Sequence, residues 1–311
     1  MAGTRRMLQD LAEINAMASA DGRALCEKAD RDYKTIVETV AGQIAGDVEN
    51  RHIVLFSGPS ASGKTTTAHM IGDTLRGKGI GVKIVSLDNF YRPASEAPLL
   101  EDGSRDLESV QALDIPLIQV CLNGLMKEGR ARFPVFDFHE GRRATDTMPI
   151  ELGSHDVIII EGIHALDPVI SQKLPGEKLY KLFISVQTSF VDKGEVILSP
   201  RDLRLCRRML RDYWFRASSP EYTLELWTQV VRGEALYIEP NRGQAQFEID
   251  SFHAFEPGLY RLMVAPLMRG VDSKNPYFRE LCRIVSQLER FVSVPLSQVP
   301  PASMVREFTG V

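Results

Sequence analysis

Short apolar runs alternate with longer amphipathic stretches over most of the chain after residue 50. An apolar run bounded by turn residues is typical of a strand that is buried on both faces of a parallel sheet. Such runs occupy residues 52–56, 82–87, 157–160, 179–185 and 247–249. Because helical patterns lie between these runs, the sequence predicts an α/β fold with a doubly wound parallel sheet.

The two ends of the chain have a different pattern, in which apolar residues recur at helical spacing. Helices are predicted over residues 7–46, with a break at 20–22, and over 257–268 and 277–292. The tail from residue 295 holds three prolines and is predicted to be extended. The expected organisation is a helical extension (1–49), a main domain (50–270) and a C-terminal helix with an extended tail (271–311).

The composition of the chain disfavours some classes of binding partner. The 311 residues carry a formal net charge of −4, which disfavours the broad basic surface that nucleic acids require. The apolar runs are far shorter than the roughly 20 residues of a membrane span. Cys26, Cys121, Cys206 and Cys282 stand far apart and form no C-x-x-C pair, which is typical of a reducing compartment. We therefore expect a cytoplasmic protein without nucleic-acid or membrane partners.

One motif indicates chemistry directly. Residues 58–65, Gly-Pro-Ser-Ala-Ser-Gly-Lys-Thr, match G-x-x-x-x-G-K-[ST] between a predicted strand and a predicted helix. In this context backbone N–H groups surround phosphates, Lys64 reaches the β/γ-phosphates and the Thr65 hydroxyl ligates Mg²⁺. The expected nucleotide-binding residues are Gly58, Ser60, Ala61, Ser62, Gly63, Lys64, Thr65 and Thr66. The motif predicts a Mg²⁺-bound nucleoside triphosphate, with the choice between ATP and GTP left open.

Two carboxylates follow predicted strands, Asp88 after 82–87 and Glu161 at the end of 157–160. Because ligands of parallel α/β sheets bind at the carboxyl ends of the strands, we expect both side chains to face the phosphates. A carboxylate there can hold Mg²⁺ or accept a proton from a substrate. The alternative is that both are solvated turn residues.

Six arginines lie within residues 201–216. On a helix Arg201, Arg204, Arg208 and Arg211 share one face, with Leu203, Cys206, Leu210 and Tyr213 roughly opposite. Arginine binds phosphate in a bidentate manner, so this face is predicted to contact the phosphates. A solvated basic face is the alternative.

Together these elements resemble the uridine kinase / phosphoribulokinase family of P-loop kinases. The matching segments occur in the family's order: 58–66, 86–91, 107–114, 133–138, 160–165 and 202–212. The resemblance is strongest to bacterial uridine-kinase-like proteins, whose C-terminus the tail 300–310 also resembles, here without the TGS-containing region that often precedes the kinase module. It implies a five-stranded parallel sheet of nucleoside-monophosphate-kinase type with a mobile helical lid at about 200–220.

The resemblance also implies roles for individual residues. Asp88 matches the general base, and Thr65 and Glu161 match the Mg²⁺ environment, to which Asp88 can add a ligand. Arg208, Arg211 and Arg216 match the residues of the lid and the transferring phosphoryl group. The cofactors implied are ATP and Mg²⁺, and the partner implied is a small molecule with a hydroxyl group.

The residues that select the substrate depart from the family pattern. The pyrimidine-reading Tyr and His fall on Phe136 and Gly141, and the ribose-binding Asp falls on Glu108. Without those polar readers, uracil is selected less strongly. The residues expected around the acceptor are Asp88, Tyr91, Glu108, Phe136, Phe138, His139 and His164. His139 either replaces the missing His or makes a local hydrogen bond.

Several interpretations therefore stay open. The sequence predicts a kinase for a small-molecule hydroxyl, nominally uridine. A different polyol, sugar or amino-alcohol acceptor, a regulatory ATP-binding module without catalysis and a nucleic-acid end kinase are the alternatives. The sequence names neither the acceptor nor the role of the N-terminal helix, and it is compatible with a homo-oligomer.

Overall fold

A five-stranded parallel sheet forms the centre of the molecule, as the sequence predicts. The computed structural model describes residues 7–137 and 140–310. The strand order is β10–β7–β2–β6–β3, and every neighbouring pair is parallel. The strands are β2 (Ile53–Ser57), β3 (Val82–Ser86), β6 (Val157–Glu161), β7 (Leu179–Ser185) and β10 (Phe247–Asp250). Each lies within two residues of its predicted apolar run. The central strands β2 and β6 are buried along their whole length, which requires such a run.

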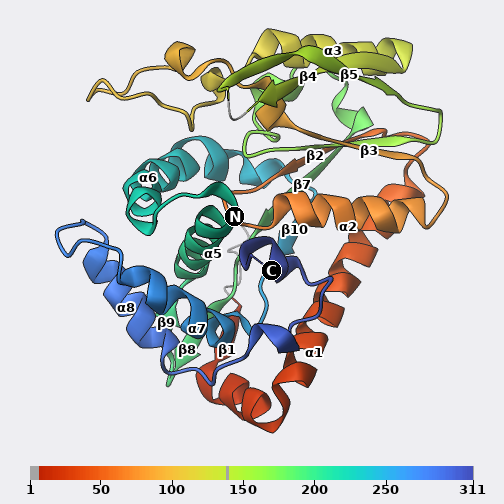
Figure 1. Ribbon diagram of the computed structural model, residues 1–311. Coiled ribbons are helices and arrows are strands. Elements are labelled where there is room, and N and C mark those ends of the chain that lie inside the picture. The colour runs from red at the N-terminus through yellow and green to blue at the C-terminus, as the bar shows by residue number, and fades with distance from the viewer. Residues whose placement is uncertain (1–6, 138–139, 311) are drawn as a thin grey trace.

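Helices cover both faces of this sheet. Successive side chains of a strand point to opposite faces, so Val54 packs with α1 (Leu11–Gly46) and α2 (Lys64–Arg76). On the other face Leu55 packs with α3 (Ile115–Glu128) and the short α4 (Pro168–Ser171). Beyond α3 lies the hairpin β4 (Arg130–Asp137) and β5 (Arg142–Glu151), at the top of Figure 1. This hairpin was not predicted, because most of its side chains are exposed and give no apolar run.

A second packed body lies below the sheet in Figure 1. It contains α5 (Pro200–Arg216), α6 (Pro220–Gly233), α7 (Glu256–Met268), α8 (Phe278–Leu288) and a small sheet of β1 (Leu8–Asp10), β8 (Ser189–Asp192) and β9 (Glu195–Leu198). Leu11 and Leu25 near the start of the chain share this core with Val299 and Val305 of the tail. The two predicted extensions are therefore packed against each other and against α5.

The tail differs from its prediction. It is not extended throughout, since Leu296–Gln298 and Met304–Phe308 form short 3₁₀ helices. Met304, Val305 and Phe308 are almost fully buried. Their burial folds the tail back onto the molecule, which the prolines alone do not predict.

The long first helix begins four residues later than predicted, after β1. Asp10 caps it by accepting hydrogen bonds from the N–H groups of Ala12 and Glu13. The predicted break at 20–22 is confirmed: Asp21 takes extended backbone angles (φ −162°, ψ 98°), so α1 consists of two helical segments that meet at a kink. Within 7–137 and 140–310, α1 and the other helices are too short or too polar to cross a membrane.

Candidate active site

The phosphate-loop motif forms the turn between β2 and α2. Ala61 (φ 59°) and Gly63 (φ 85°) take left-handed backbone angles there. Two of its glycines have no room for a side chain: a Cβ at Gly58 would lie 2.0 Å from the Ile184 carbonyl oxygen, and one at Gly63 would lie 2.5 Å from Met304 Sδ. This backbone directs N–H groups toward the start of α2, where a helix favours anions. Lys64 Nζ donates to the Pro59 carbonyl at 3.0 Å, across the loop.

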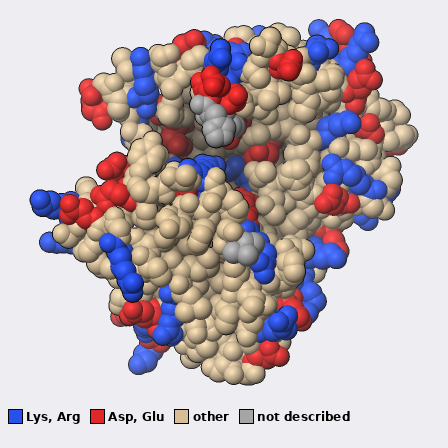
Figure 2. Space-filling view, in the orientation of Figure 1, with Lys and Arg blue, Asp and Glu red and all other residues tan. Residues whose placement is uncertain are grey.

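A polar cavity of about 210 Å³ lies over this loop. It brings together loop residues with the predicted acids and arginines: Ser60, Ala61, Ser62, Gly63, Lys64, Thr65, Asp88, Tyr91, Glu108, Glu161, Arg208, Arg211 and Arg216. Figure 2 shows basic side chains gathered in a hollow in the middle of this face. Residues that are far apart in the sequence therefore meet at one edge of the sheet, as the strand-end argument predicts.

The two strand-end carboxylates face Lys64. Asp88 lies in the 3₁₀ turn Leu87–Phe90, where Ser86 Oγ accepts from its N–H, and Glu161 is the last residue of β6. Removal from water raises the pKa of both carboxyls, and Lys64 opposes that rise. Burial lowers the pKa of Lys64, which the acids oppose in turn. The site thus places groups of opposite charge in a poorly hydrated space.

The same edge offers oxygen ligands for a cation. Thr65 Oγ1 lies 3.5 Å from Glu161 Oε1. Within the described part of the chain no cluster of three or more His, Cys, Asp or Glu side chains could hold a metal. Mg²⁺ typically takes only one or two protein oxygens and completes its shell with phosphate and water. Thr65 and Glu161, beside Asp88, therefore fit Mg²⁺ bound together with a nucleotide.

Three arginines of α5 line the cavity. Arg208 Nη1 donates to Ser60 Oγ at 2.8 Å, which ties the helix to the phosphate loop. Asp212 contacts Arg208, Arg211 and Arg216 at 3.3, 2.7 and 3.6 Å. Burial, and then repulsion from Arg211, lowers the pKa of Arg216; burial also lowers the pKa of Arg208. One carboxylate thus balances three guanidinium groups here.

The predicted arginine face of α5 is wrong in part, because the helix is buried on several sides. Arg204 is not presented with Arg208; its side chain is 3% exposed and pairs with Glu234. Arg207 is fully buried and forms a bidentate pair with Glu256, with N–O distances of 2.6 and 2.7 Å. Ten of the helix residues are buried between the phosphate loop and the second body. The mobile lid at about 200–220 stays a prediction. Because most of α5 is buried, packing restrains its last turn least.

Of the residues predicted around the acceptor, Tyr91 and Glu108 line the cavity, whereas His164 and Phe136 do not. Burial raises the pKa of Glu108 and lowers that of His164 to about 4, so the imidazole is neutral at pH 7. His164 is 1% exposed, its two ring nitrogens lack hydrogen-bond partners among the described residues, and its ring meets Tyr237 edge-on. Tyr91 meets Phe136 edge-on, and Asn89 Oδ1 accepts from the Phe136 N–H. Phe138 and His139 lie outside the described residues.

Three residues that line the cavity were not predicted as site residues: Gly162 and Ile163, which follow Glu161, and Glu307. Glu307, in the tail, lines the cavity and accepts a hydrogen bond from Thr66 Oγ1 at 2.6 Å. It follows Thr66 by 241 residues. The tail's resemblance to a bacterial subgroup was the only available signal, and it carries no role for a particular residue.

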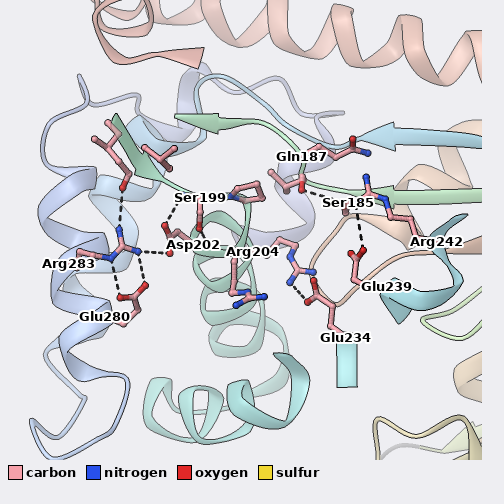
Figure 3. Close-up of a pocket in the computed structure, with 15 residues that line it drawn as sticks. Ser185, Gln187, Ser199, Asp202, Arg204, Glu234, Glu239, Arg242, Glu280 and Arg283 are labelled. Atoms are coloured by element: carbon pink, nitrogen blue, oxygen red, sulfur yellow. Dashed lines mark hydrogen bonds and ion pairs between the residues drawn. The ribbon is translucent and has the colours of Figure 1, made fainter. Parts of the chain in front are cut away.

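A larger cavity, of about 710 Å³, lies at the other end of α5 (Figure 3). Its charged groups pair with one another: Arg204 with Glu234, Arg283 with Asp202 and Glu280, and Arg242 with Glu239. None of the phosphate-loop residues lines it. The volume of a cavity therefore does not identify the reaction site in this molecule, whereas the presence of the phosphate loop does.

Comparisons with known proteins show which proteins the chain is similar to. A uridine kinase from Deinococcus deserti is 27% identical over 208 residues, which cover 67% of this chain and 91% of that protein. A uridine kinase from Mycoplasma genitalium is 33% identical over 179 residues, which cover 58% and 75%. A solved structure described as a possible uridine kinase from Bacillus stearothermophilus matches with a TM-score of 0.45 and 16% identity, over 65% of this chain and 89% of that chain. The sequence pattern of the phosphoribulokinase / uridine kinase family matches residues 53–255, and the chain belongs to that family.

Proposed function

We propose that the protein transfers a phosphoryl group from Mg²⁺-bound ATP to a hydroxyl group of a small molecule. The observation that supports this most is the single cavity in which the phosphate loop, two desolvated carboxylates and three arginines meet. Phosphoryl transfer needs positioning and charge stabilisation, and this set of groups supplies both. Bound Mg²⁺ would neutralise charge on the phosphates beside Thr65 and Glu161.

Asp88 is the proposed general base. It lies in the cavity opposite Lys64, and burial raises the pKa of its carboxyl, which makes it a better proton acceptor than an exposed aspartate. Lys64, Arg216 and Arg211 oppose this rise in pKa and favour the charged carboxylate, which is the form that accepts a proton. Arg208, Arg211 and Arg216 then stabilise the negative charge of the transferring group.

The nominal acceptor is a nucleoside such as uridine, the substrate named for the curated relatives. Two observations favour a second candidate, a polyol, sugar or amino alcohol. Phe136 has no hydroxyl group to read a pyrimidine, and no atom of the residues that the structure describes lies within 4 Å of the position of a Cβ at Gly141. Glu108 and His164 would then be the polar groups that select the acceptor.

A screen of ADP release over nucleosides, sugars, polyols and amino alcohols tests this proposal. We expect at least one hydroxyl compound to raise ADP release well above the rate with water alone, and only with Mg²⁺ present. Strong selection of uridine and cytidine would exclude the second candidate. If no compound raised ADP release although the nucleotide bound, the chain would be a regulatory ATP-binding module instead.

A further inference from the structure

The long first helix, α1, has no part in the proposed reaction so far. The family match begins at residue 53, after α1 ends at Gly46. The second segment of α1, after the kink, nevertheless packs against α2: Tyr33 and Val37 share one apolar core with Ala68 and Ile71. Because the phosphate loop leads directly into α2, a helix outside the matched region lies against the element that holds the loop.

A polar contact joins the two helices inside this core. Tyr33 is 2% exposed, and its hydroxyl oxygen lies 2.5 Å from Thr67 Oγ1 in the first turn of α2. Thr67 Oγ1 donates in turn to the Gly63 carbonyl of the phosphate loop at 2.6 Å. A hydroxyl group has a single proton and a carbonyl can only accept, so the proton of Thr67 points to Gly63. The Tyr33 hydroxyl is therefore the donor to Thr67, and the three groups form one directed chain that ends at the phosphate loop.

The hydrogen bond at Gly63 also sets the direction of a neighbouring N–H group. The peptide unit between Gly63 and Lys64 is planar and trans, so its carbonyl and its N–H point to opposite sides. Holding the Gly63 carbonyl toward Thr67 therefore holds the Lys64 N–H as well, at the start of α2, where a helix favours anions. The loop needs such support, because Ala61 takes left-handed backbone angles (φ 59°) that residues other than glycine rarely adopt.

Neighbouring groups hold Tyr33 in place. The ring of the fully buried His253 packs against the Tyr33 ring, with 4.9 Å between their centres. Asp30, one turn earlier on α1, lies 3.3 Å from His253 Nε2 and accepts from Ser303 Oγ at 2.8 Å. Burial raises the pKa of Tyr33, so the phenol keeps the proton that it donates. The hydroxyl group is therefore positioned before any nucleotide binds.

We propose that Tyr33 is a positioning residue of the nucleotide site, which acts through Thr67 to hold the phosphate loop in the shape that binds phosphate. A loop that is already ordered loses less conformational entropy when the ligand binds, and this raises the affinity. The first helix then takes part in nucleotide binding, although it lies outside the region that matches the family. This inference rests on the proposed nucleotide site.

Calorimetric titration of the full chain with Mg²⁺-bound pyrophosphate and with Mg²⁺-bound ADP tests the proposal without using turnover. Tyr33→Phe removes the donor, Thr67→Val removes the link to Gly63, and Thr67→Ser keeps that link. Tyr180→Phe is the matched control, because the Tyr180 hydroxyl donates to Gln43 of α1 at 2.6 Å. That contact also joins α1 to the sheet, but at the start of β7, the opposite edge from the phosphate loop. Thermal melts establish that each variant folds as the unaltered chain does.

We expect Thr67→Val to weaken the binding of pyrophosphate and of ADP by the same factor, about 3- to 12-fold, the range for one hydrogen bond. Tyr33→Phe should weaken both about threefold or more, because Thr67 loses the donor that orients its hydroxyl group. The double variant Tyr33→Phe/Thr67→Val should bind as Thr67→Val does, since both hydroxyls belong to one chain. Thr67→Ser and Tyr180→Phe should bind both ligands as the unaltered chain does.

The proposal is wrong if Tyr33→Phe binds pyrophosphate as tightly as the unaltered chain, because the contact would then only hold α1 in place. An equal loss of affinity in Tyr180→Phe would attribute the effect to a loosened α1, and a loss for ADP alone would place it away from the phosphate loop. Failure of the proposed kinase function would look different: the variants would show the expected binding, but no hydroxyl compound would raise ADP release.

Discussion

The two ends of α5 use the same residue type for different purposes. Toward the N-terminus, Arg204 and Arg207 each have a carboxylate partner, Glu234 and Glu256, and are shielded from water. Toward the C-terminus, Arg208, Arg211 and Arg216 share Asp212 and line the phosphate cavity. An arginine with a carboxylate partner of its own stabilises the fold, whereas arginines that share one carboxylate stay available to a phosphate. The position of an arginine on a helical face does not make this distinction.

This difference has a physical cause. A buried ion pair costs desolvation on both sides, and removing one partner leaves an unpaired charge in a poorly hydrated space. Arginines that share one carboxylate partner, as Arg208, Arg211 and Arg216 share Asp212, keep part of their interaction free energy for an incoming anion. Substitution at the two ends of α5 should therefore change different measured quantities.

The largest effect is expected at the cavity end. Arg208→Gln removes a cation that contacts the loop through Ser60, and kcat/KM for the best acceptor should fall about 10³-fold. The melting temperature should change little, because the substitution removes the contacts of Arg208 but also removes the free-energy cost of keeping its charge away from water. Initial rates and a thermal melt of the same preparation measure both. Retention of more than a tenth of the activity would mean that Arg208 does not act on the phosphoryl group.

The next effect concerns stability at the other end. Arg207→Met leaves the carboxylate of Glu256 unpaired and fully buried, and should lower the free energy of unfolding by about 3–5 kcal/mol in a urea titration. The double variant Arg207→Met/Glu256→Met removes both charges and should recover much of this loss. If Arg207→Met were as stable as the unaltered chain, the pair would not be structural.

The third effect is a dependence on pH. Because burial raises the pKa of Asp88, the folded protein binds that proton more tightly than the unfolded chain does. The contribution of Asp88 to stability is therefore present at low pH and is lost as the pH rises through its raised pKa. Asp88→Asn should have a higher free energy of unfolding than the unaltered chain at pH 7, with the difference shrinking toward low pH. Urea titrations from pH 4 to 8 measure this, and an Asn variant that is less stable at pH 7 would contradict it.

The smallest effect is expected where an arginine of α8 meets the start of α5. Arg283 is 40% exposed and contacts Asp202 at 2.6 Å. Partly exposed pairs contribute roughly 0.2–1 kcal/mol, so Arg283→Gln should lower the free energy of unfolding by less than about 1 kcal/mol. Its kcat/KM should be unchanged. A tenfold loss of activity would show that the start of α5 is coupled to the cavity.

The sequence predicts those parts of the site that depend on local pattern. The phosphate loop and the strand-end acids Asp88 and Glu161 follow from short motifs and from where parallel strands end. The role of Arg207 could not be predicted, because it depends on Glu256, 49 residues away, and differs from that of the adjacent Arg208. Glu307 was missed for the same reason, since only the folded tail brings it to Thr66.

The parts of the fold that escaped prediction are those with little apolar pattern. The hairpin β4–β5 is mostly exposed, and the small sheet of β1, β8 and β9 has strands of three or four residues. The tail has buried residues at irregular spacing, which neither a helix nor a strand period reveals. In contrast, apolar residues predominate in most of the five central strands, and all five strands were predicted.

The most direct test of the account compares the unaltered chain with Asp88→Asn in ADP release, using the best acceptor of the screen, and in nucleotide binding by calorimetry. Loss of a general base should lower turnover about 10²- to 10⁴-fold, while the affinity for Mg²⁺-bound ADP stays within a few-fold, because the loop and the arginines remain. Normal turnover by Asp88→Asn would contradict the assignment of the cavity as a site of phosphoryl transfer with Asp88 as its base.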